Sequence, residues 1–182
     1  PDPVLLFVGR LSYPPNEDAV RWFASSVLPL VRARVPRARF RVVGAGGENL
    51  SAELSELTGV EFVGAVEHLK AQLDIANVAV VPIRFGAGTR LKVIEAMANR
   101  IPLATTSVGC EGIDVEDGVH CLIGDDETSL AEACVRLLEN ADLRGRIADA
   151  ADTLYRERYR WSTIQQTFAQ LAREAASSDR AR

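Results

Sequence analysis

Short runs of β-branched and other apolar residues alternate with helical segments along most of this chain. Such alternation is typical of a parallel sheet whose two faces are covered by helices. The expected strands are 4–9, 40–44, 60–64, 78–82, 101–107 and 120–124. The pattern therefore predicts one α/β domain over 1–182: a doubly wound, Rossmann-like parallel sheet of about six strands, with helices on both faces and a helical C-terminal tail.

The segments between these strands have helical periodicity. The expected helices are 16–35, 50–57, 68–76, a helix after Thr89, 129–140, 142–158 and a last one from about Trp161. Asn16 is expected to cap the first helix, and Ser129 with Glu132 to form a capping box. Trp161 is expected to anchor the last helix, whose apolar residues Ile164, Phe168 and Leu171 are expected to be exposed.

Composition excludes several classes of protein. Of the 182 residues 47% are hydrophobic, as in ordinary globular domains, and the net charge of -4 argues against nucleic acid as a partner. No apolar run approaches the roughly 18 residues that a membrane span needs, and no signal peptide opens the chain. Its cysteines, Cys110, Cys121 and Cys134, lack metal-site spacing and indicate reduced thiols in the cytoplasm. Because the chain starts without methionine, we expect a domain of a longer protein.

Four loops leave the expected carboxyl ends of strands, where ligands bind in open parallel sheets. The loop GAGGEN (44–49) is not a dinucleotide fingerprint, because Asn49 stands where a third glycine is required. No Gly-Lys-Ser/Thr follows it, so it is not a P-loop either. Acidic runs at 114–117 and 125–127 are expected to be loop and helix-start acids rather than metal ligands.

The stretch FGAGTRLKVIEAMA (85–98) is the more informative loop. Gly86 and Gly88 would allow an anion to approach free backbone N–H groups at a helix start capped by Thr89. Arg90 and Lys92 in the first turn oppose the helix dipole unless an anion lies between them. The expected apolar face of this helix is Leu91, Ile94 and Ala98.

Glu95 follows Lys92 by three residues and shares its helical face. A surface ion pair worth a few tenths of a kcal/mol explains that spacing as well as a phosphate cradle does. Spacing alone leaves both interpretations open.

Several motifs together carry a family resemblance. FVGRL (7–11), VVGAGG (42–47), VEFVGAVEHL (60–69), VAVVPIRFGAGTRLKVIEAMANRIPLATTSVGCEGI (78–113) and RYRWS (158–162) occur in this order. The chain resembles, over nearly its whole length, the carboxy-terminal half of family-four retaining glycosyltransferases, which have two facing Rossmann-like domains (the GT-B fold). Residues 79–112 carry the most specific part of the resemblance.

The resemblance implies a nucleotide-sugar donor site. Arg10, Lys92 and Arg90 would contact the donor diphosphate, the first two as the catalytic cations, and Glu95 would accept hydrogen bonds from the ribose hydroxyls. Backbone groups at Ala65 and Val66 would hold the edge of the base. The expected donor-binding residues are Gly9, Arg10, Ala65, Val66, Gly86, Ala87, Gly88, Thr89, Arg90, Lys92 and Glu95.

Two positions depart from the pattern. Ala87 stands where many members have a glutamate that touches the donor sugar, so that contact must come from elsewhere. Asn16 stands where many members have a lysine, which shifts the diphosphate charge onto Arg10, Arg90 and Lys92.

By this resemblance the expected function is transfer of a sugar from a UDP-, GDP- or ADP-sugar to an acceptor in polysaccharide or glycolipid synthesis. Charge would develop on the leaving β-phosphate during a front-face displacement, with no metal or other cofactor. The expected partner is an N-terminal acceptor-binding domain absent from this chain, so the chain alone would bind nucleotide without transfer. The complete enzyme would be cytoplasmic, with peripheral association at the inner face of the membrane. Alternatives are a non-catalytic nucleotide-binding module and half of a GT-B nucleotide-sugar epimerase.

Overall fold

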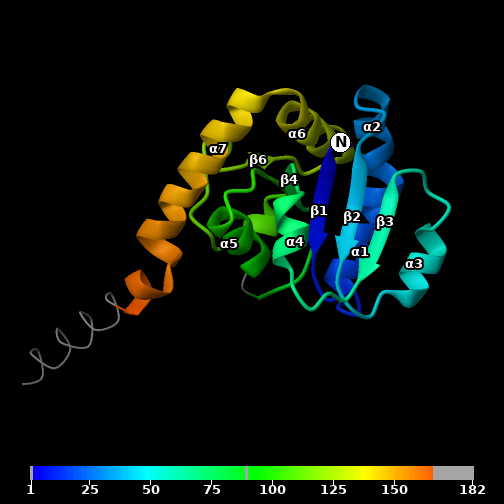
Figure 1. The fold of residues 1–182 in the computed structure, drawn as a ribbon, viewed down its shortest axis with the longest axis horizontal. Helices are drawn as coiled ribbons and strands as arrows, with labels where there is room; N and C mark the ends of the chain where they lie inside the picture. Colours follow the sequence, from blue (N-terminus) through cyan, green and yellow to red (C-terminus); the bar gives the residue numbers. More distant parts are fainter. Residues whose placement is uncertain (1, 89, 166–182) are drawn as a thin grey trace, which may run out of the picture.

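The computed structural model describes residues 2–88 and 90–165 and contains a six-stranded sheet at the centre of a single α/β domain (Figure 1). The strands lie in the order β3-β2-β1-β4-β5-β6, and every neighbouring pair is parallel. Their bounds are β1 Val4–Val8, β2 Arg39–Val43, β3 Val60–Gly64, β4 Val78–Val81, β5 Leu103–Thr105 and β6 Leu122–Ile123. The predicted fold class, including its strand number, is confirmed.

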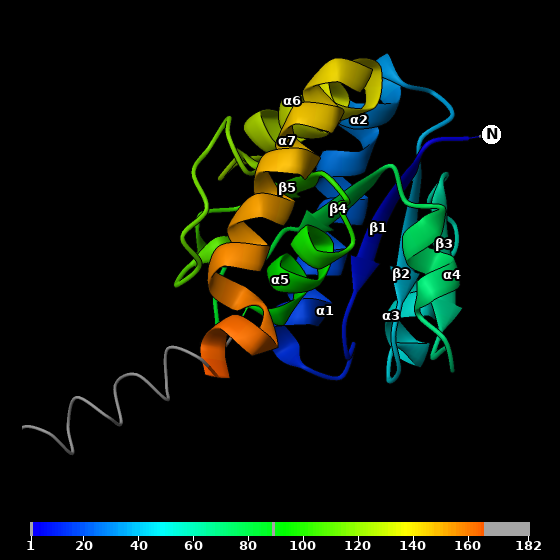
Figure 2. The same ribbon diagram turned by 60° about the vertical axis from the view of Figure 1, so that its left-hand side comes forward.

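Helices cover both faces of this sheet (Figure 2). One face carries α1 Pro14–Trp22, the π-helical turn η1 Phe23–Val27, α2 Leu28–Arg34, α3 Glu48–Leu54 and α6 Glu127–Glu139. The other face carries α4 Lys70–Asp74 and α5 Leu91–Ala98, while α7 Ala141–Leu154 packs along α5. A 3-10 turn, η2 Val108–Cys110, follows β5, and a π-helical turn, η3 Tyr155–Tyr159, ends α7.

The core lies mainly between the central strands and the long helices. Leu5 and Phe7 of β1 and all of β4 are buried, as expected of central parallel strands that are covered on both sides. Phe23 of η1 contacts Phe40 of β2 with ring centroids 4.4 Å apart. The rigid centre of the sheet supports the loops that leave its carboxyl edge.

Two predicted helix starts are wrong. Helix α1 begins at Pro14 rather than being capped by Asn16, because proline at the first helical position has the required φ and loses no helical hydrogen bond. Helix α6 begins at Glu127, and its capping box joins Asp126 with Ser129, not Ser129 with Glu132. Asp126 accepts from the Ser129 backbone N–H at 2.8 Å.

The buried face of α5 also differs from the prediction. Val93, Ala96 and Met97 face the core, whereas Leu91 and Ala98 are exposed. The helix is apolar on more than one side, so hydrophobic periodicity could not determine which side packs on the sheet. The N-cap is Arg90, with no side-chain cap; Thr89, the predicted cap, lies outside the described residues.

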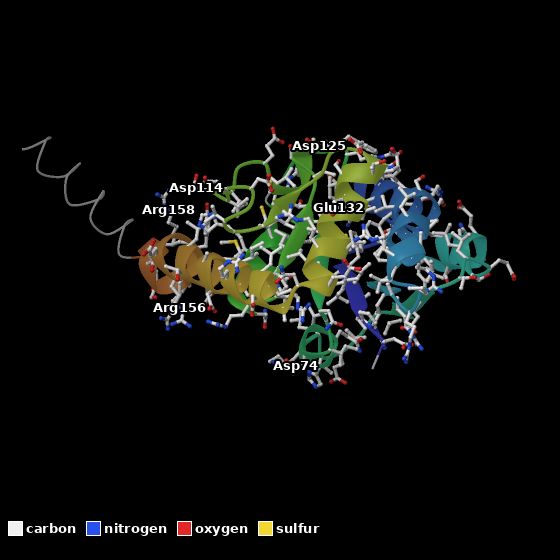
Figure 3. The ribbon with its side chains drawn as sticks, turned by 90° about the horizontal axis from the view of Figure 1, so that it is seen from above. Asp74, Asp114, Asp125, Glu132, Arg156 and Arg158 are labelled. Carbon is white, nitrogen blue, oxygen red and sulfur yellow. The ribbon has the colours of Figure 1, made fainter. Side chains whose placement is uncertain are left out.

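The end of the described chain is fixed by polar contacts. Figure 3 shows Arg158 beside Asp114, and their ion pair measures 2.6 Å. The hydroxyl oxygen of Tyr159 accepts from the backbone N–H of Asp114 at 2.8 Å. Trp161 is 69% exposed, so the prediction that it anchors the last helix is wrong. Ile164 is exposed as expected, while Phe168 and Leu171 lie outside the described residues.

All three cysteines are free and buried. Burial raises the pKa of the Cys121 thiol to about 12 and also raises the pKa of the Cys134 thiol, so both stay protonated at neutral pH. None of the described helices has the length and apolar character that a bilayer crossing requires.

Candidate functional site

The candidate site lies where β1 and β4 meet at the carboxyl edge of the sheet. Strand order runs from β1 through β2 to β3 on one side and through β4 to β6 on the other, so the topological switch point is between β1 and β4. Loops diverge at such a point and leave a crevice for ligands. A cavity of 160 Å³ opens there, lined by Tyr13, Pro15, Asn16, Val81, Ile83, Ala87, Arg90, Leu91 and Lys92.

Lys92 is a partly buried cation of this cavity. Its Nζ lies 5.5 Å from the centre of the Phe7 ring, and it makes no hydrogen bond or ion pair with any described residue. Burial lowers the pKa of Lys92, with the Glu95 carboxylate opposing and Arg90 reinforcing that change. The ammonium is therefore placed where an added anion would find a donor that is already partly desolvated.

Arg90 precedes Lys92 by two residues and lines the same cavity. Its side chain is only 9% exposed, and its Nη2 donates to the Gly86 carbonyl at 3.0 Å and to Glu111 at 3.3 Å. The Nε of Arg90 is buried and lacks a hydrogen-bond partner among the described residues. A buried guanidinium N–H without an acceptor is costly, so this edge of the cavity has unused capacity to bind an anion.

The loop after β1 supplies the third cation. Arg10 is exposed, and its side chain makes no hydrogen bond or ion pair with any described residue. Its carbonyl accepts from Asn16 Nδ2 at 2.7 Å. Asn16 is 4% exposed, and its side-chain amide bonds the loop after β1 instead of capping α1. A Cβ on Gly9 would lie 2.8 Å from Lys92 Cε and 3.0 Å from Asn16 Nδ2, so only glycine allows both side chains to approach this loop.

Gly86 and Gly88 give the glycine-rich segment its path. Both have φ of 112°, in the region that favours glycine. A Cβ on Gly86 would lie 2.7 Å from Pro15 Cγ, so Gly86 packs against the start of α1, whereas space around Gly88 is open. Between them, the Ala87 carbonyl accepts from the Tyr13 hydroxyl at 3.2 Å. Thr89, also expected here, is outside the described residues.

Ala65 and Val66 lie at the end of β3, away from the cations. Ala65 borders a second hollow of 330 Å³, together with the glycine loop 44–47 and Phe62. Val66 packs with the apolar cluster under α4 instead. The structure thus joins Arg90 and Lys92 with the glycine-rich segment and brings the Gly9–Arg10 loop against Lys92 through Gly9. Of the two expected base contacts, Ala65 borders the adjacent hollow.

Glu95 is exposed on α5, and the described residues contain no Lys92–Glu95 ion pair. The two residues instead border a narrow space of 20 Å³ between α5 and β1. The surface ion pair that the sequence left open is therefore not formed, which leaves both side chains available to a ligand.

A larger hollow of 680 Å³ is lined by residues of α2, α6 and the start of α7. Figure 1 shows the ends of these helices near the amino ends of the strands. Exposed ion pairs of Arg34 with Glu132 and Glu139 line the hollow. It is open and bordered by charges that already neutralise one another, so its size does not indicate a ligand site.

The acidic runs act in the structure as loop and helix-start residues. Asp125 accepts from the Ser107 hydroxyl at 2.6 Å, and Asp117 accepts from the Ile123 N–H at 2.8 Å. Asp114 and Asp125, labelled in Figure 3, come from separate loops. Within 2–88 and 90–165, no group of three or more His, Cys, Asp or Glu could hold a metal ion.

Sequence reasoning missed three contributors to the site: Tyr13, Arg84 and Glu111. Arg84 binds Asp18, which is far away in the sequence, and Glu111 binds Arg90 from the loop after β5. Neither pairing has a local spacing signal. Tyr13 could have been noticed as an aromatic residue in a strand-end loop.

The chain is similar to known sugar transferases. The chain is 26% identical over 183 residues to an alpha-D-kanosaminyltransferase of Streptomyces kanamyceticus, covering 94% of this chain and 46% of that protein. It is 28% identical over 180 residues to a phosphatidyl-myo-inositol mannosyltransferase of Mycobacterium leprae (strain TN), covering 96% and 47%. The chain thus spans about half the length of these curated relatives.

A solved structure of S. aureus TarM in complex with UDP and alpha-GlcNAc-glycerol shares the fold, with a TM-score of 0.76. The two chains are 18% identical, and the match covers 93% of this chain and 35% of that one. The family model described as glycosyl transferases group 1 matches residues 2–140, which is more than half of the chain. This match shows that the chain belongs to the glycosyl transferases group 1 family.

Proposed function

We propose that this chain is the donor-binding half of a retaining glycosyltransferase. It would bind a nucleoside-diphosphate sugar whose sugar goes to an acceptor in polysaccharide or glycolipid synthesis. One observation carries the proposal: two neighbouring cations have donors without acceptors. The partly buried Lys92 ammonium has no acceptor among the described residues. The Arg90 side chain is 9% exposed, and its Nε has no hydrogen-bond partner among them either. Buried charges normally have partners, and a diphosphate offers several acceptor oxygens at once.

The proposed role of the cations is electrostatic. When the bond between the sugar and the β-phosphate breaks, negative charge grows on the departing diphosphate. Arg10, Arg90 and Lys92 stabilise that charge through donors that are already oriented before the reaction starts. The chain need supply no nucleophile for this step, and we propose that no metal ion is required.

The remaining predicted residues contribute to donor binding in this proposal. Gly86, Ala87, Gly88 and Thr89 lie against the distal phosphate and the sugar, and Glu95 accepts from the ribose hydroxyls. The hollow beside Ala65 takes the base, whose edge meets the backbone of Ala65 and Val66. Its 330 Å³ is in the range of small-ligand pockets.

The relatives support a sugar-nucleotide donor. Two are named as transferases of sugar groups, and the structural neighbour was solved with UDP. Because the chain spans about half of those relatives, we place the acceptor site in a further domain. The isolated chain is accordingly expected to bind nucleotide without transferring sugar. We place the complete enzyme in the cytoplasm, acting at the inner face of the membrane.

A thermal-shift panel with UDP, GDP and ADP tests the proposal. One nucleotide should raise the melting temperature selectively, since a ligand that binds only the folded state stabilises it. Lys92→Ala and Glu95→Ala should each reduce the shift, while Lys70→Ala, which removes an exposed ion pair with Asp74, should not. No shift with any nucleotide, or equal shifts in all variants, would contradict the site. Transfer of radiolabelled sugar by the complete protein then tests the reaction.

A further inference from the structure

Arg84 opens the glycine-rich segment 84–88 and is fixed on helix α1. Its Nη2 and Nε donate to the two carboxylate oxygens of Asp18, at 2.6 and 3.0 Å. The guanidinium carbon also lies 4.9 Å from the centre of the Trp22 ring. The bidentate contact with the carboxylate restricts movement of the guanidinium within its own plane. Stacking on the indole restricts its movement perpendicular to that plane.

Trp22, on which Arg84 stacks, is itself fixed. The residue is 6% exposed, and its indole N–H donates to Glu127 at 2.9 Å in the first turn of α6. The network therefore joins the loop after β4 to two helices on one face of the sheet. None of Arg84, Asp18 and Trp22 lines the 160 Å³ cavity, so any effect on a ligand acts through the segment that Arg84 begins.

Two more contacts hold the same segment on the first turn of α1. Gly86 packs on Pro15, and the Tyr13 hydroxyl donates to the Ala87 carbonyl at 3.2 Å. That turn also carries Asn16, which donates to the Arg10 carbonyl at 2.7 Å. The start of α1 thus touches both cation-bearing loops and sets the distance between them.

We infer that Arg84 is a positioning residue for the diphosphate cradle. Its contacts with Asp18 and Trp22 hold the Gly86 carbonyl where it accepts from Arg90 Nη2 at 3.0 Å, and so direct the Arg90 guanidinium into the cavity. Arg84 itself does not line the cavity, so it is not expected to contact the nucleotide sugar. The inference rests on the proposed function, because it takes a diphosphate as the ligand that benefits.

The experiment measures the UDP dissociation constant of the chain by calorimetry for the wild type, Arg84→Gln, Arg84→Lys, Asp18→Asn and the Arg84→Gln/Asp18→Asn double variant. Misplaced binding groups lose affinity steeply with distance, so Arg84→Gln should weaken UDP binding about fivefold to tenfold. Arg84→Lys should recover part of the loss, since it keeps one charged contact. The double variant should bind no more weakly than either single variant, because both remove the same contact.

Arg21→Gln is the matched control. Arg21 lies on α1, the helix that carries Asp18, and forms ion pairs with Glu17 and Glu53. Its side chain is 41% exposed, against 43% for that of Arg84. It has no contact with the glycine-rich segment, so UDP affinity should not change. Backbone 15N relaxation without nucleotide adds a readout of position: amide order parameters of residues 85–88 should fall in Arg84→Gln and stay at the wild-type values in Arg21→Gln.

The possible results distinguish failure of the positioning role of Arg84 from failure of the proposed function. If wild type binds UDP, Lys92→Ala abolishes binding, and Arg84→Gln binds like wild type, the positioning role is overturned while the proposed function stands. If wild type binds none of UDP, GDP and ADP, the proposed function fails, and the relaxation measurement still decides whether Arg84 holds the segment. Unchanged order parameters of 85–88 in Arg84→Gln overturn the inference in either case.

Discussion

The ammonium of Lys92 lies 5.5 Å from the centre of the buried ring of Phe7, at the carboxyl end of β1. This contact brings the cation of α5 against the first strand, beneath the loop that carries Arg10. An aromatic face attracts a cation, but it cannot accept the hydrogen bonds that three N–H groups offer. Lys92 is therefore held in place while its donors remain available.

Lys92→Met should separate binding from stability. Methionine keeps the apolar stem that packs on Phe7 and removes the partly desolvated charge, so the free energy of unfolding should stay within about 1 kcal/mol of wild type. UDP affinity should fall about tenfold to a hundredfold, because the variant loses the hydrogen bonds that the charged ammonium would donate to the diphosphate. Chemical denaturation and calorimetry measure the two quantities. A large stability loss with intact affinity would contradict the site.

UDP affinity should depend on pH through Lys92. Burial lowers the pKa of this lysine, so the ammonium begins to deprotonate at lower pH than an exposed lysine. A bound diphosphate favours the charged form, so UDP binding should weaken as pH rises through the lowered pKa of Lys92, at lower pH than an exposed lysine would require. Binding in that window should also take up protons, which calorimetry in two buffers of different ionisation enthalpy detects.

Lys92→Arg is the control for that pH series, because a guanidinium does not titrate in this range. The variant should keep part of the affinity and lose the pH dependence. If Lys92→Arg and wild type weaken in parallel as pH rises, the dependence comes from the nucleotide or another group, and not from Lys92.

Glu111→Gln should strengthen anion binding. Glu111 is 72% exposed and pairs with Arg90 at 3.3 Å, so its carboxylate occupies a donor that a diphosphate would use. Exposed ion pairs are weak, and removing this competition should improve UDP affinity about twofold to fivefold. Glu132→Gln, which breaks an exposed pair with Arg34, should leave affinity unchanged. Weaker binding by Glu111→Gln would show that Glu111 supports the ligand instead.

Most of the fold could be predicted from the sequence because strand and helix periods alternate clearly. The four strands β1 to β4 begin and end within one residue of the predicted ranges, whereas β5 and β6 are shorter than 101–107 and 120–124. Parallel pairing at the sheet edge stops where a neighbour turns away, which the sequence of one strand does not reveal. The face of α5 was misassigned because Leu91 and Val93 are equally apolar.

Within the candidate site, Gly86, Gly88, Arg90 and Lys92 could be predicted because they lie in one segment, 84–95. Asn16 could not, since an asparagine before a helical pattern usually caps it, and here the two prolines move the helix start to Pro14. Arg84 pairs with Asp18 and Glu111 with Arg90 across the fold. Such contacts depend on how α1 and the loop after β5 meet the β4 loop, and a local spacing rule cannot detect them.

Gly44→Ala should be the most destabilising single change at this edge. Gly44 has φ of 152°, and a Cβ there would lie 1.8 Å from the Gly9 carbonyl oxygen, which is backbone and cannot rotate away. The strand-end loops of β1 and β2 would have to separate, at a cost of about 2–4 kcal/mol in unfolding free energy. Because Gly9 lies against Lys92, UDP affinity should fall as well.

Gly88→Ala provides the comparison that isolates the clash from backbone strain. Gly88 also has positive φ, 112°, but a Cβ there would have no heavy atom within 4 Å. Its cost should be about 1 kcal/mol, from the unfavourable φ alone. Urea denaturation of both variants with wild type gives the difference. If Gly44→Ala costs no more than Gly88→Ala, the β1 and β2 loops do not pack as closely as the structure shows, and the Gly9–Lys92 contact would have to be reconsidered.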